Sequence, residues 1–264
     1  MTTPAAASHA DRFLPLRGTT NTRDLGGLPV AGGGTTATGR VWRSDAALAL
    51  GHEDLEALAR IGLTTVVDLR EARELAFEPS AFLGHPFVVV HHVEVWRLVS
   101  ERAGRPADPY DITAFYVAAL DHAGDAFAEA ARLIADAPGA AVFHCTAGKD
   151  RTGVLAALLL EAVGVPRAAV IEDFALTHDR IGSVRERLLA DAVRQGVDPR
   201  QFGRLLGATA DLIEPALAHL DRRHGGAVAY LTAAGVDAAT LARLRAKLAP
   251  ASEPLAPSSE PLVP

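Results

Sequence analysis

The chain has 264 residues, of which 49% are hydrophobic and 22% are charged, so it can bury a sizeable core and is neither disordered throughout nor fibrous. Its 26 basic and 32 acidic side chains leave a formal net charge of −6, which argues against a general nucleic-acid binder. The one cysteine can form neither an internal disulfide nor a multi-cysteine zinc site, so its thiol is inert, regulatory or catalytic.

Neither end of the chain has the pattern of a packed element. Residues 1–11 are small and polar, and residues 250–264 carry five prolines, so we expect disordered ends around a single domain over 12–249. The apolar stretch over 154–165 contains Glu161 and is far shorter than the ~20 residues of a membrane span. No signal peptide is visible, so we expect a cytoplasmic protein without stable membrane insertion, while export by another route stays open.

Short apolar runs alternate with helical patterns in the first half of the chain. They predict strands over 40–44, 64–69, 87–95 and 140–143. Helices are expected over 52–61 and, in one or two pieces, over 110–135. Strands separated by helices indicate the α/β class, with a mostly parallel sheet flanked by helices.

The second half of the chain has helical patterns only, over 151–163, 166–177, 182–193, 208–223, 227–234 and 238–248. The first of these is apolar nearly all round, which is typical of a helix buried inside a domain. Gly235 can end the fifth helix and Asp237 can cap the sixth. The sequence thus predicts an α/β core followed by a C-terminal helical elaboration.

The segment most informative about function is VFHCTAGKDRTG, residues 142–153. Cys145 stands at the end of a predicted strand, and a helix begins at about Arg151, after a turn that contains Gly148. Such a strand–turn–helix can aim successive backbone N–H groups at one centre and bind an anion at the helix N-terminus. The same surroundings favour a thiolate at Cys145, and Arg151 offers a planar fork for two phosphate oxygens.

This arrangement predicts a nucleophile at the floor of a phosphate cradle. The thiolate of Cys145 would attack phosphorus in line, and water would hydrolyse the cysteinyl-phosphate. The hydroxyl of Thr152, also at the phosphate, could donate a hydrogen bond to the thiolate and help it leave. These steps need no metal ion or other cofactor. The alternative is that Cys145 is a buried structural cysteine beside a helix cap. Such a cysteine would not require the specific sequence HCTAGKDRTG around it.

HCTAGKDRTG resembles the signature loop of the protein-tyrosine-phosphatase superfamily, and its Gly-Lys-Asp-Arg variant resembles that of the bacterial tyrosine/serine phosphatase family. Residues 21–27 (NTRDLGG), 39–45 (GRVWRSD), 67–70 (VDLR) and the pattern over 230–245 resemble further segments of that family, so the likeness spans about 15–249. The resemblance implies a cysteine-dependent phosphatase with Cys145 as the nucleophile and Arg151 as a phosphate ligand. It also implies that the backbone of the loop surrounds the phosphate, at Thr146, Ala147, Gly148, Lys149, Asp150 and Arg151.

The resemblance leaves the general acid and the role of the loop lysine open. Asp150 is the better candidate for the acid. Glu94 stands where some relatives offer another acid, although they use an aspartate there. Lys149, one of only two lysines in the chain, could add charge for polyanionic substrates or could pair with an acidic neighbour.

Several other residues are expected to support the loop or to contact substrate. Arg23, Asp24 and Arg43 should form a polar network near the carboxyl end of the sheet. His144 should orient the loop, whereas His91 and His92 alternate on a strand and cannot easily share a metal ion. The family usually has tyrosine and asparagine where this chain has Phe174 and His178, which could alter access to the site. The resemblance also suggests that helices between 182 and 223 form a lid.

The leading hypothesis is a tyrosine, or dual-specificity, protein phosphatase acting on a phosphorylated protein. The same chemistry on a phosphoinositide, nucleotide or metabolic intermediate is an alternative, as is a non-catalytic phosphate-binding module. A deep cleft would favour phosphotyrosine as the substrate, whereas a closed pocket would favour a small phosphorylated molecule. Arsenate reduction normally requires a resolving thiol, which this chain lacks. The sequence does not indicate the oligomeric state.

Overall fold

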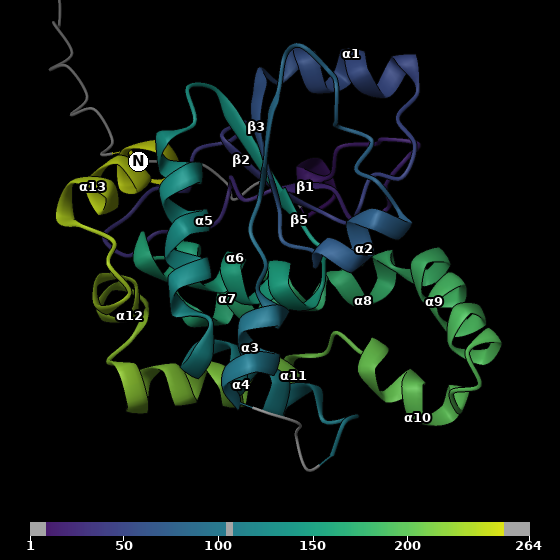
Figure 1. Ribbon diagram of the computed structural model, residues 1–264. Helices are drawn as coiled ribbons and strands as arrows, with labels where there is room; N and C mark the ends of the chain where they lie inside the picture. Colours follow the sequence, from purple (N-terminus) through teal and green to yellow (C-terminus); the bar gives the residue numbers. More distant parts are fainter. Residues whose placement is uncertain (1–8, 104–107, 251–264) are drawn as a thin grey trace, which may run out of the picture.

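The computed structural model describes residues 9–103 and 108–250 (Figure 1). We expected residues 1–8 and 251–264 to be disordered, and they lie outside this described part of the chain. A short 3-10 helix, His9–Arg12, begins within the segment that we expected to be disordered and precedes the first strand.

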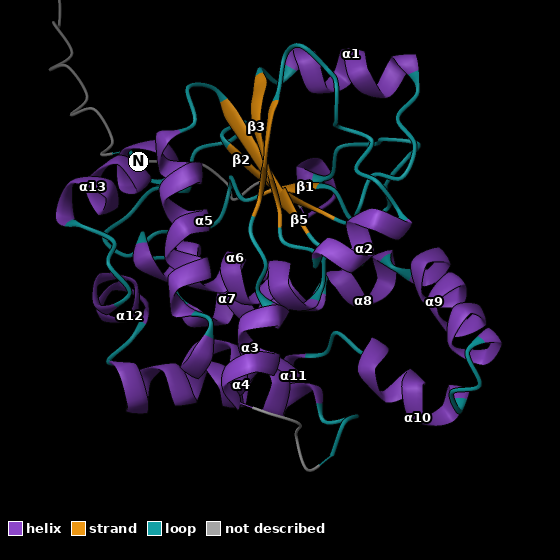
Figure 2. Ribbon diagram, viewed as in Figure 1, coloured by secondary structure: helices purple, strands orange, loops and turns teal. Residues whose placement is uncertain are grey.

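Five strands form one sheet in the order β1-β2-β5-β3-β4 (Figure 2). Four of the strands are parallel, and only β1 runs antiparallel to its neighbour β2. Their bounds are β1 Arg23–Asp24, β2 Val41–Ser44, β3 Leu63–Asp68, β4 Val89–His92 and β5 Ala140–His144. The predicted α/β class and the mostly parallel sheet are confirmed, and the expected bounds of β2, β3 and β5 are each correct to within one residue.

The two faces of the sheet are covered differently. Val66 and Val142 pack with Leu58 of α1 (His52–Arg60) on one face. Val67 and Phe143, the next residue along each strand, belong to the large core formed with most of the other helices. This alternation is the period of two that β-strands impose, and it explains why β3 and β5 have no polar face.

Edge strand β4 is shorter than the run expected over 87–95. It pairs with β3 alone, and each of its four residues is half-buried or exposed. Two short helices beside it were not expected, α2 (Ala72–Phe77) and α3 (Trp96–Ala103). None of the six residues of α2 is buried, so α2 lacks the apolar stripe by which a helix is recognised in a sequence.

The helical core is built around α6 (Asp150–Ala162), in which every residue except Asp150 and Glu161 is buried. The long pattern over 110–135 forms two helices that meet at Ala123, α4 (Ile112–His122) and α5 (Gly124–Asp136). After α6 come α7 (Arg167–Ala175) and the single turn α8 (Thr177–Arg180).

The last part of the chain divides into a peripheral segment and a packed one. Residues 182–206 form α9 (Gly182–Arg194), α10 (Pro199–Gly203) and a 3-10 turn (Arg204–Leu206), which extend to one side of the body (Figure 1). We call these residues the covering segment. The packed helices are α11 (Ala210–His219), followed by a π-helical turn (Leu220–His224), α12 (Ala227–Ala233) and α13 (Ala238–Leu248).

The expected signals at the last two helices are present. Gly235 has a φ of 91° directly after α12, and the Asp237 carboxylate accepts a hydrogen bond from Thr240 N at 2.7 Å at the start of α13. Within the described residues, every helix is too short or too polar to span a bilayer.

Candidate active site

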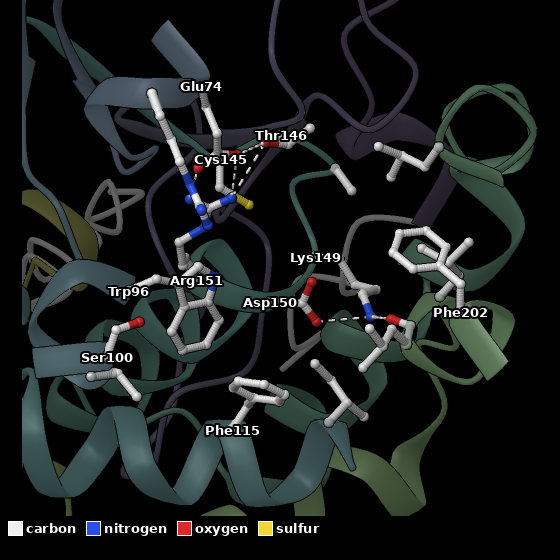
Figure 3. A pocket seen from close by; sticks show the side chains of 17 residues that line it. Glu74, Trp96, Ser100, Phe115, Cys145, Thr146, Lys149, Asp150, Arg151 and Phe202 are labelled. Carbon is white, nitrogen blue, oxygen red and sulfur yellow. Dashed lines mark hydrogen bonds and ion pairs between the residues drawn. The ribbon is translucent and has the colours of Figure 1, made fainter. Parts of the chain in front are cut away.

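A cavity of about 330 Å³ lies where β5 ends and α6 begins (Figure 3). Its polar floor is formed by consecutive residues of the 142–153 segment and by two residues of α2, namely Cys145, Thr146, Ala147, Lys149, Asp150, Arg151, Arg73 and Glu74. Its walls are mainly apolar and come from α3, α4 and the covering segment, namely Trp96, Val99, Ser100, Ile112, Phe115, Leu188, Phe202, Leu205 and Leu206. The sequence therefore identified the part of the floor that comes from the 142–153 segment, and the structure adds Arg73, Glu74 and the walls.

The loop after Cys145 is held with its carbonyl groups pointing outward. The side-chain amide of Asn21 donates to the carbonyls of Ala147 and Gly148, both at 3.2 Å, and Arg43 Nη2 donates to the Gly148 carbonyl at 2.8 Å. In a trans peptide the N–H points away from the C=O, so the N–H groups of residues 148 and 149 face the opposite side. Successive N–H groups that face one side are the arrangement that an anion-binding nest needs, and such a nest stays the prediction for this loop.

Gly148 is required at its position for two separate reasons. Its φ is 63°, in the left-handed region that glycine tolerates. A Cβ at this position would also lie 2.4 Å from the Ser44 carbonyl oxygen at the end of β2, which packs directly against the loop. A larger residue would therefore push the loop away from the sheet.

Arg151 is fixed by a carboxylate from another element. Its Nη1 and Nη2 donate to the two oxygens of Glu74 on α2, at 2.5 and 2.9 Å, and Thr146 Oγ1 donates to the same carboxylate. Burial would raise the pKa of Glu74, but the hydrogen bonds and charge of Arg151 outweigh it and lower this pKa to about 2. Burial would lower the pKa of Arg151, but the hydrogen bonds to Glu74 and the charge of Cys145 outweigh this effect and raise the pKa above its ordinary value.

Two side-chain donors in the first turn of α6 have no hydrogen-bond partner among the described residues. They are Nε of Arg151 and Oγ1 of Thr152, both buried. Arg151 also lies over the Trp96 ring, 6.0 Å from its centroid (Figure 3). A buried N–H and a buried O–H without partners are costly, which is typical of groups that receive their partner from a ligand.

Asp150 points into the cavity between two donors (Figure 3). The buried hydroxyl of Tyr116 on α4 donates to Asp150 Oδ1 at 2.6 Å, and Lys149 Nζ lies 2.8 Å from the same oxygen. Burial, and then the charge of Asp150, raise the pKa of Tyr116 well above its ordinary value, so the phenol keeps its proton. Tyr116 is 34 residues from Asp150, and no pattern in the sequence indicates this contact.

Comparison with known proteins identifies the family. The model of the tyrosine phosphatase family matches residues 14–250. The chain belongs to this family. The family expected from the sequence is thus confirmed, and the chain is a cysteine-dependent, protein-tyrosine-phosphatase-like enzyme.

Relatives of this phosphatase match most of its length. A protein of Cupriavidus necator, provisionally assigned as a tyrosine-protein phosphatase, is 34% identical over 90% of each chain. The triple specificity protein phosphatase PtpB of Mycobacterium tuberculosis is 28% identical over 90% of this chain and 99% of its own. A crystal structure of TpbA from P. aeruginosa in complex with pTyr is 22% identical, covers 64% of this chain and 85% of TpbA, and has a TM-score of 0.30.

In this phosphatase Lys149 does not extend into the open cavity. Its side chain is 1% exposed, and besides Asp150 its ammonium binds the backbone carbonyls of Leu205 and Gly207, the latter at 2.9 Å. The loop lysine thus pairs with an acidic neighbour, one of the two alternatives that the sequence left open, and also holds the end of the covering segment.

Arg23 and Arg43 lie behind the phosphate loop and share one carboxylate. Asp173 of α7 binds Arg23 Nε at 3.1 Å, Arg43 Nη1 at 2.7 Å and Arg12 Nη2 at 2.5 Å, and all four side chains are buried. Burial and the neighbouring Arg43 lower the pKa of Arg23 to about 9, whereas the three guanidiniums lower the pKa of Asp173 against the effect of its burial. Of these side chains, only Arg43 contacts the loop directly, through Gly148.

Asp24 and Glu94, two further candidates, do not reach the cavity. The Asp24 carboxylate accepts from the backbone N–H groups of Gly26 and Gly39, at 2.9 and 2.5 Å, and burial raises its pKa. Glu94 accepts from Ala72 N at 2.7 Å, at the start of α2, and so supports the helix that carries Glu74.

His144 lies beneath the loop in the sheet. Its ring is fully buried against Phe82, and its Nδ1 is 3.3 Å from the Cys145 carbonyl oxygen. Burial lowers the pKa of His144, so the ring is neutral at pH 7 even though Asp68 lies 3.5 Å from Nε2. These contacts orient the loop, as the sequence suggested.

The covering segment is narrower than the lid expected over 182–223. Leu188 of α9, Phe202 of α10, and Leu205 and Leu206 of the 3-10 turn line the cavity. Helix α11 instead packs against α4 and α7 and is part of the body of the phosphatase.

Proposed function

We propose that this phosphatase hydrolyses phosphotyrosine in proteins, with some activity on phosphoserine, through a cysteinyl-phosphate formed on Cys145. The observation that carries this proposal is the composition of the cavity. A phosphate cradle forms its floor, and the Trp96 and Phe115 rings, with centroids 5.9 Å apart and edge to face, stand beside it. An aryl ring placed against these walls would bring its phosphate to the thiolate, whereas the shorter phosphoserine side chain would leave the apolar walls unfilled.

In the first step the Cys145 thiolate attacks phosphorus and the bond from phosphorus to the phenolic oxygen breaks. The loop N–H groups and Arg151 bind the three non-bridging oxygens, where charge is redistributed in the transition state. Asp150, in its protonated form, gives its proton to the leaving oxygen, so the product is neutral tyrosine. Tyr116 keeps the Asp150 carboxyl aimed into the cavity.

In the second step a water molecule attacks the cysteinyl-phosphate. The Asp150 carboxylate accepts the proton of this water, the bond between sulfur and phosphorus breaks, and inorganic phosphate and the thiolate are released. The hydroxyl of Thr152, which is buried in the first turn of α6 without a partner among the described residues, would donate to the departing sulfur. The two steps balance for protons and charge and regenerate the starting enzyme.

Small phosphorylated molecules are a less favoured substrate class. Two of the three cations at the floor are already engaged, Arg151 by Glu74 and Lys149 by Asp150 and two backbone carbonyls. Beyond the cradle itself, a polyanion such as a phosphoinositide would find only Arg73 of α2 without an ion pair among the described residues that line the cavity. The name of PtpB states triple specificity for that protein, which is a reason to compare several substrate types in one test.

The test is a panel assay in EDTA that compares wild type with Cys145→Ser. We expect the phosphotyrosyl peptide to be hydrolysed with a kcat/KM at least tenfold above that of a phosphoseryl peptide, a phosphoinositide, a nucleotide or a sugar phosphate. Cys145→Ser should abolish all turnover while the protein still binds inorganic phosphate. A small molecule as the best substrate would overturn the proposed specificity, and phosphate binding without turnover by wild type would indicate a non-catalytic module.

The role of Asp150 is tested with leaving groups of different basicity. Asp150→Asn keeps the size of the side chain and its contact with Tyr116 but cannot give up a proton. We expect kcat on the phosphotyrosyl peptide to fall by roughly 10²–10⁴-fold, the usual contribution of a general acid. The loss should be much smaller for p-nitrophenyl phosphate, whose leaving group needs little protonation. An equal loss on both substrates would mean that Asp150 only shapes the loop.

A further inference from the structure

We propose that Asp121, His219 and His224 bind a zinc ion at a site separate from the phosphate cavity. Asp121 lies one residue before the end of α4, His219 is the last residue of α11, and His224 is the last residue of the π-helical turn. The Nε2 atoms of the two histidines lie 2.8 and 3.0 Å from the same oxygen, Oδ1 of Asp121. None of the three residues lines the cavity at Cys145.

The π-helical turn is what brings the two imidazoles together. His219 and His224 are five residues apart, a spacing that an α-helix of 3.6 residues per turn would place about 140° apart around its axis. The wider π-helical turn, with its i→i+5 hydrogen bonds, returns residue 224 to nearly the same side as residue 219. The two rings consequently lie edge to face with centroids 5.8 Å apart. Such turns often mark functional sites in helices.

The site is pre-arranged and still open to an ion from solvent. The His224 ring is held edge-on against the buried Tyr230 ring, with centroids 5.1 Å apart. The side chains of Asp121, His219 and His224 are 29%, 21% and 22% exposed, so one side of the cluster faces water. The three candidate ligand atoms all lie within 4.8 Å of one another.

The donor set and the distances fit zinc with little rearrangement. Zinc binds imidazole nitrogen and carboxylate oxygen at about 2.0–2.2 Å, which in a tetrahedron places ligand atoms about 3.3–3.6 Å apart. The two Nε2–Oδ1 distances therefore need to open by only about half an ångström, within the freedom of half-exposed side chains. The ion would replace the hydrogen bonds to Oδ1, bind each ring through an unprotonated Nε2, and take water as its fourth ligand.

The charges around the site do not oppose a cation strongly. Asp125, four residues after Asp121, is paired with Arg102 at 2.8 Å, so it adds no net charge. Arg222 and Arg223 are exposed on the π-helical turn and can extend into solvent. Bound zinc would link α4, which carries Phe115 and Tyr116, to α11, which follows the backbone that holds Lys149.

The experiment is calorimetric titration of the metal-free protein with zinc chloride. A Cys145→Ser background removes the thiolate, which can itself bind zinc, and leaves the proposed site intact. In that background we expect one zinc ion per chain, and a loss of affinity of roughly 100-fold or more on His219→Ala or His224→Ala, since even outer-shell changes cost 10–100-fold. Zinc at about 100 times its dissociation constant should raise Tm by about 5 °C or more, and neither histidine variant should respond.

His52→Ala is the matched control. His52 also lies beside a carboxylate, with its Nε2 3.1 Å from Glu56. Among the described residues, no second histidine binds that carboxylate, so the pair lacks the third ligand of the proposed site. We expect its zinc binding and its Tm shift to equal those of the Cys145→Ser parent. Because the Tm of each metal-free variant is recorded as well, misfolding is seen directly. Binding that persists in both His219→Ala and His224→Ala, or that disappears with Cys145→Ser alone, would overturn the proposal.

Discussion

Arg151 has five N–H donors, and Glu74 determines how many of them a phosphate can use. Both Nη atoms donate to Glu74, Nη1 also donates to the Leu69 carbonyl at 3.3 Å, and Nη2 also donates to Thr146 Oγ1 at 3.3 Å. Four donors are therefore occupied, and Nε–H is the one without a partner among the described residues. A phosphate oxygen can bind Nε–H directly, and a second oxygen can bind Nη2 in place of Thr146. We infer that Glu74 positions the guanidinium for substrate.

Replacing Glu74 with glutamine should therefore reduce catalysis without unfolding the protein. The amide can still accept one hydrogen bond but loses the charge-assisted, two-point contact, which is worth about 1.5–3 kcal/mol. We expect kcat/KM on a phosphotyrosyl peptide to fall by about 10- to 100-fold. The Kd of inorganic phosphate should change less, because removing a competing carboxylate partly offsets the loss of order.

The control for Glu74→Gln is Glu101→Gln, which breaks an exposed ion pair with Arg97 on α3. Exposed pairs contribute little, so kcat/KM should stay within about twofold of wild type. If Glu74→Gln also left kcat/KM unchanged, the carboxylate would not be a positioning group for Arg151.

At this scale the sequence identified those site residues that are neighbours along the chain. Cys145, Asp150 and Arg151 belong to one contiguous segment whose residue types specify its chemistry. Glu74 and Tyr116 belong to separate helices, and their sequence surroundings contain nothing unusual. Their contacts exist only because the sheet order places α2 and α4 beside the carboxyl end of β5.

The covering segment is attached to the body by very few strong contacts, and the most buried of them is Lys149. The Lys149 ammonium donates to the carbonyls of Leu205 and Gly207, shortly before α11 begins at Ala210. In Lys149→Met these carbonyls lose their partner while the volume of the side chain is nearly kept. We expect faster amide hydrogen exchange over 182–206, with exchange in α11 unchanged.

Lys247→Met is a matched control, because Lys247 is the other lysine of the chain and also binds two backbone carbonyls. Its ammonium donates to Ala137 at 2.5 Å and to Gly139 at 3.0 Å, on the far side of the molecule from the covering segment. Lys247→Met should leave amide hydrogen exchange over 182–206 at the wild-type rate. Equal protection of the covering segment in Lys149→Met and wild type would show that its apolar contacts alone keep it in place.

Elements were predictable wherever one face of the element is strongly apolar. The buried strands β2, β3 and β5 and the all-round apolar α6 were placed almost to the residue. By contrast, the run over 208–223 was expected to be one regular helix, and it ends in a π-helical turn after His219. A π-helical turn of five residues is too short to leave a periodicity of its own in the hydrophobic pattern, so the sequence did not distinguish it from the end of an α-helix.

Across the whole molecule, Asp173 connects parts of the chain that are far apart in sequence. It binds Arg12 before the first strand, Arg23 on β1 and Arg43 on β2, and Arg43 in turn holds the phosphate loop. The sequence predicted a polar network at Arg23, Asp24 and Arg43. The Asp24 carboxylate binds Gly26 and Gly39 instead, and no pattern in the sequence placed α7 within the network. One buried carboxylate is the shared ion-pair partner of three guanidiniums, so its removal takes that partner from all three buried positive charges.

Asp173→Asn should accordingly destabilise the phosphatase by about 3–5 kcal/mol in urea unfolding at pH 7, the range found when one partner of a buried ion pair is removed. The Asp136→Asn control breaks an exposed pair with Arg243 and should cost no more than about 0.5 kcal/mol. The pKa of Asp173 is lowered in the folded state, so its contribution is fully present above its ordinary value of 3.8 and is lost as the pH falls below that value. The difference between wild type and Asp173→Asn should therefore be constant from pH 7 to about pH 5 and shrink below pH 4. A difference that instead grew on acidification would mean that Asp173 is not the ionised partner of the three arginines.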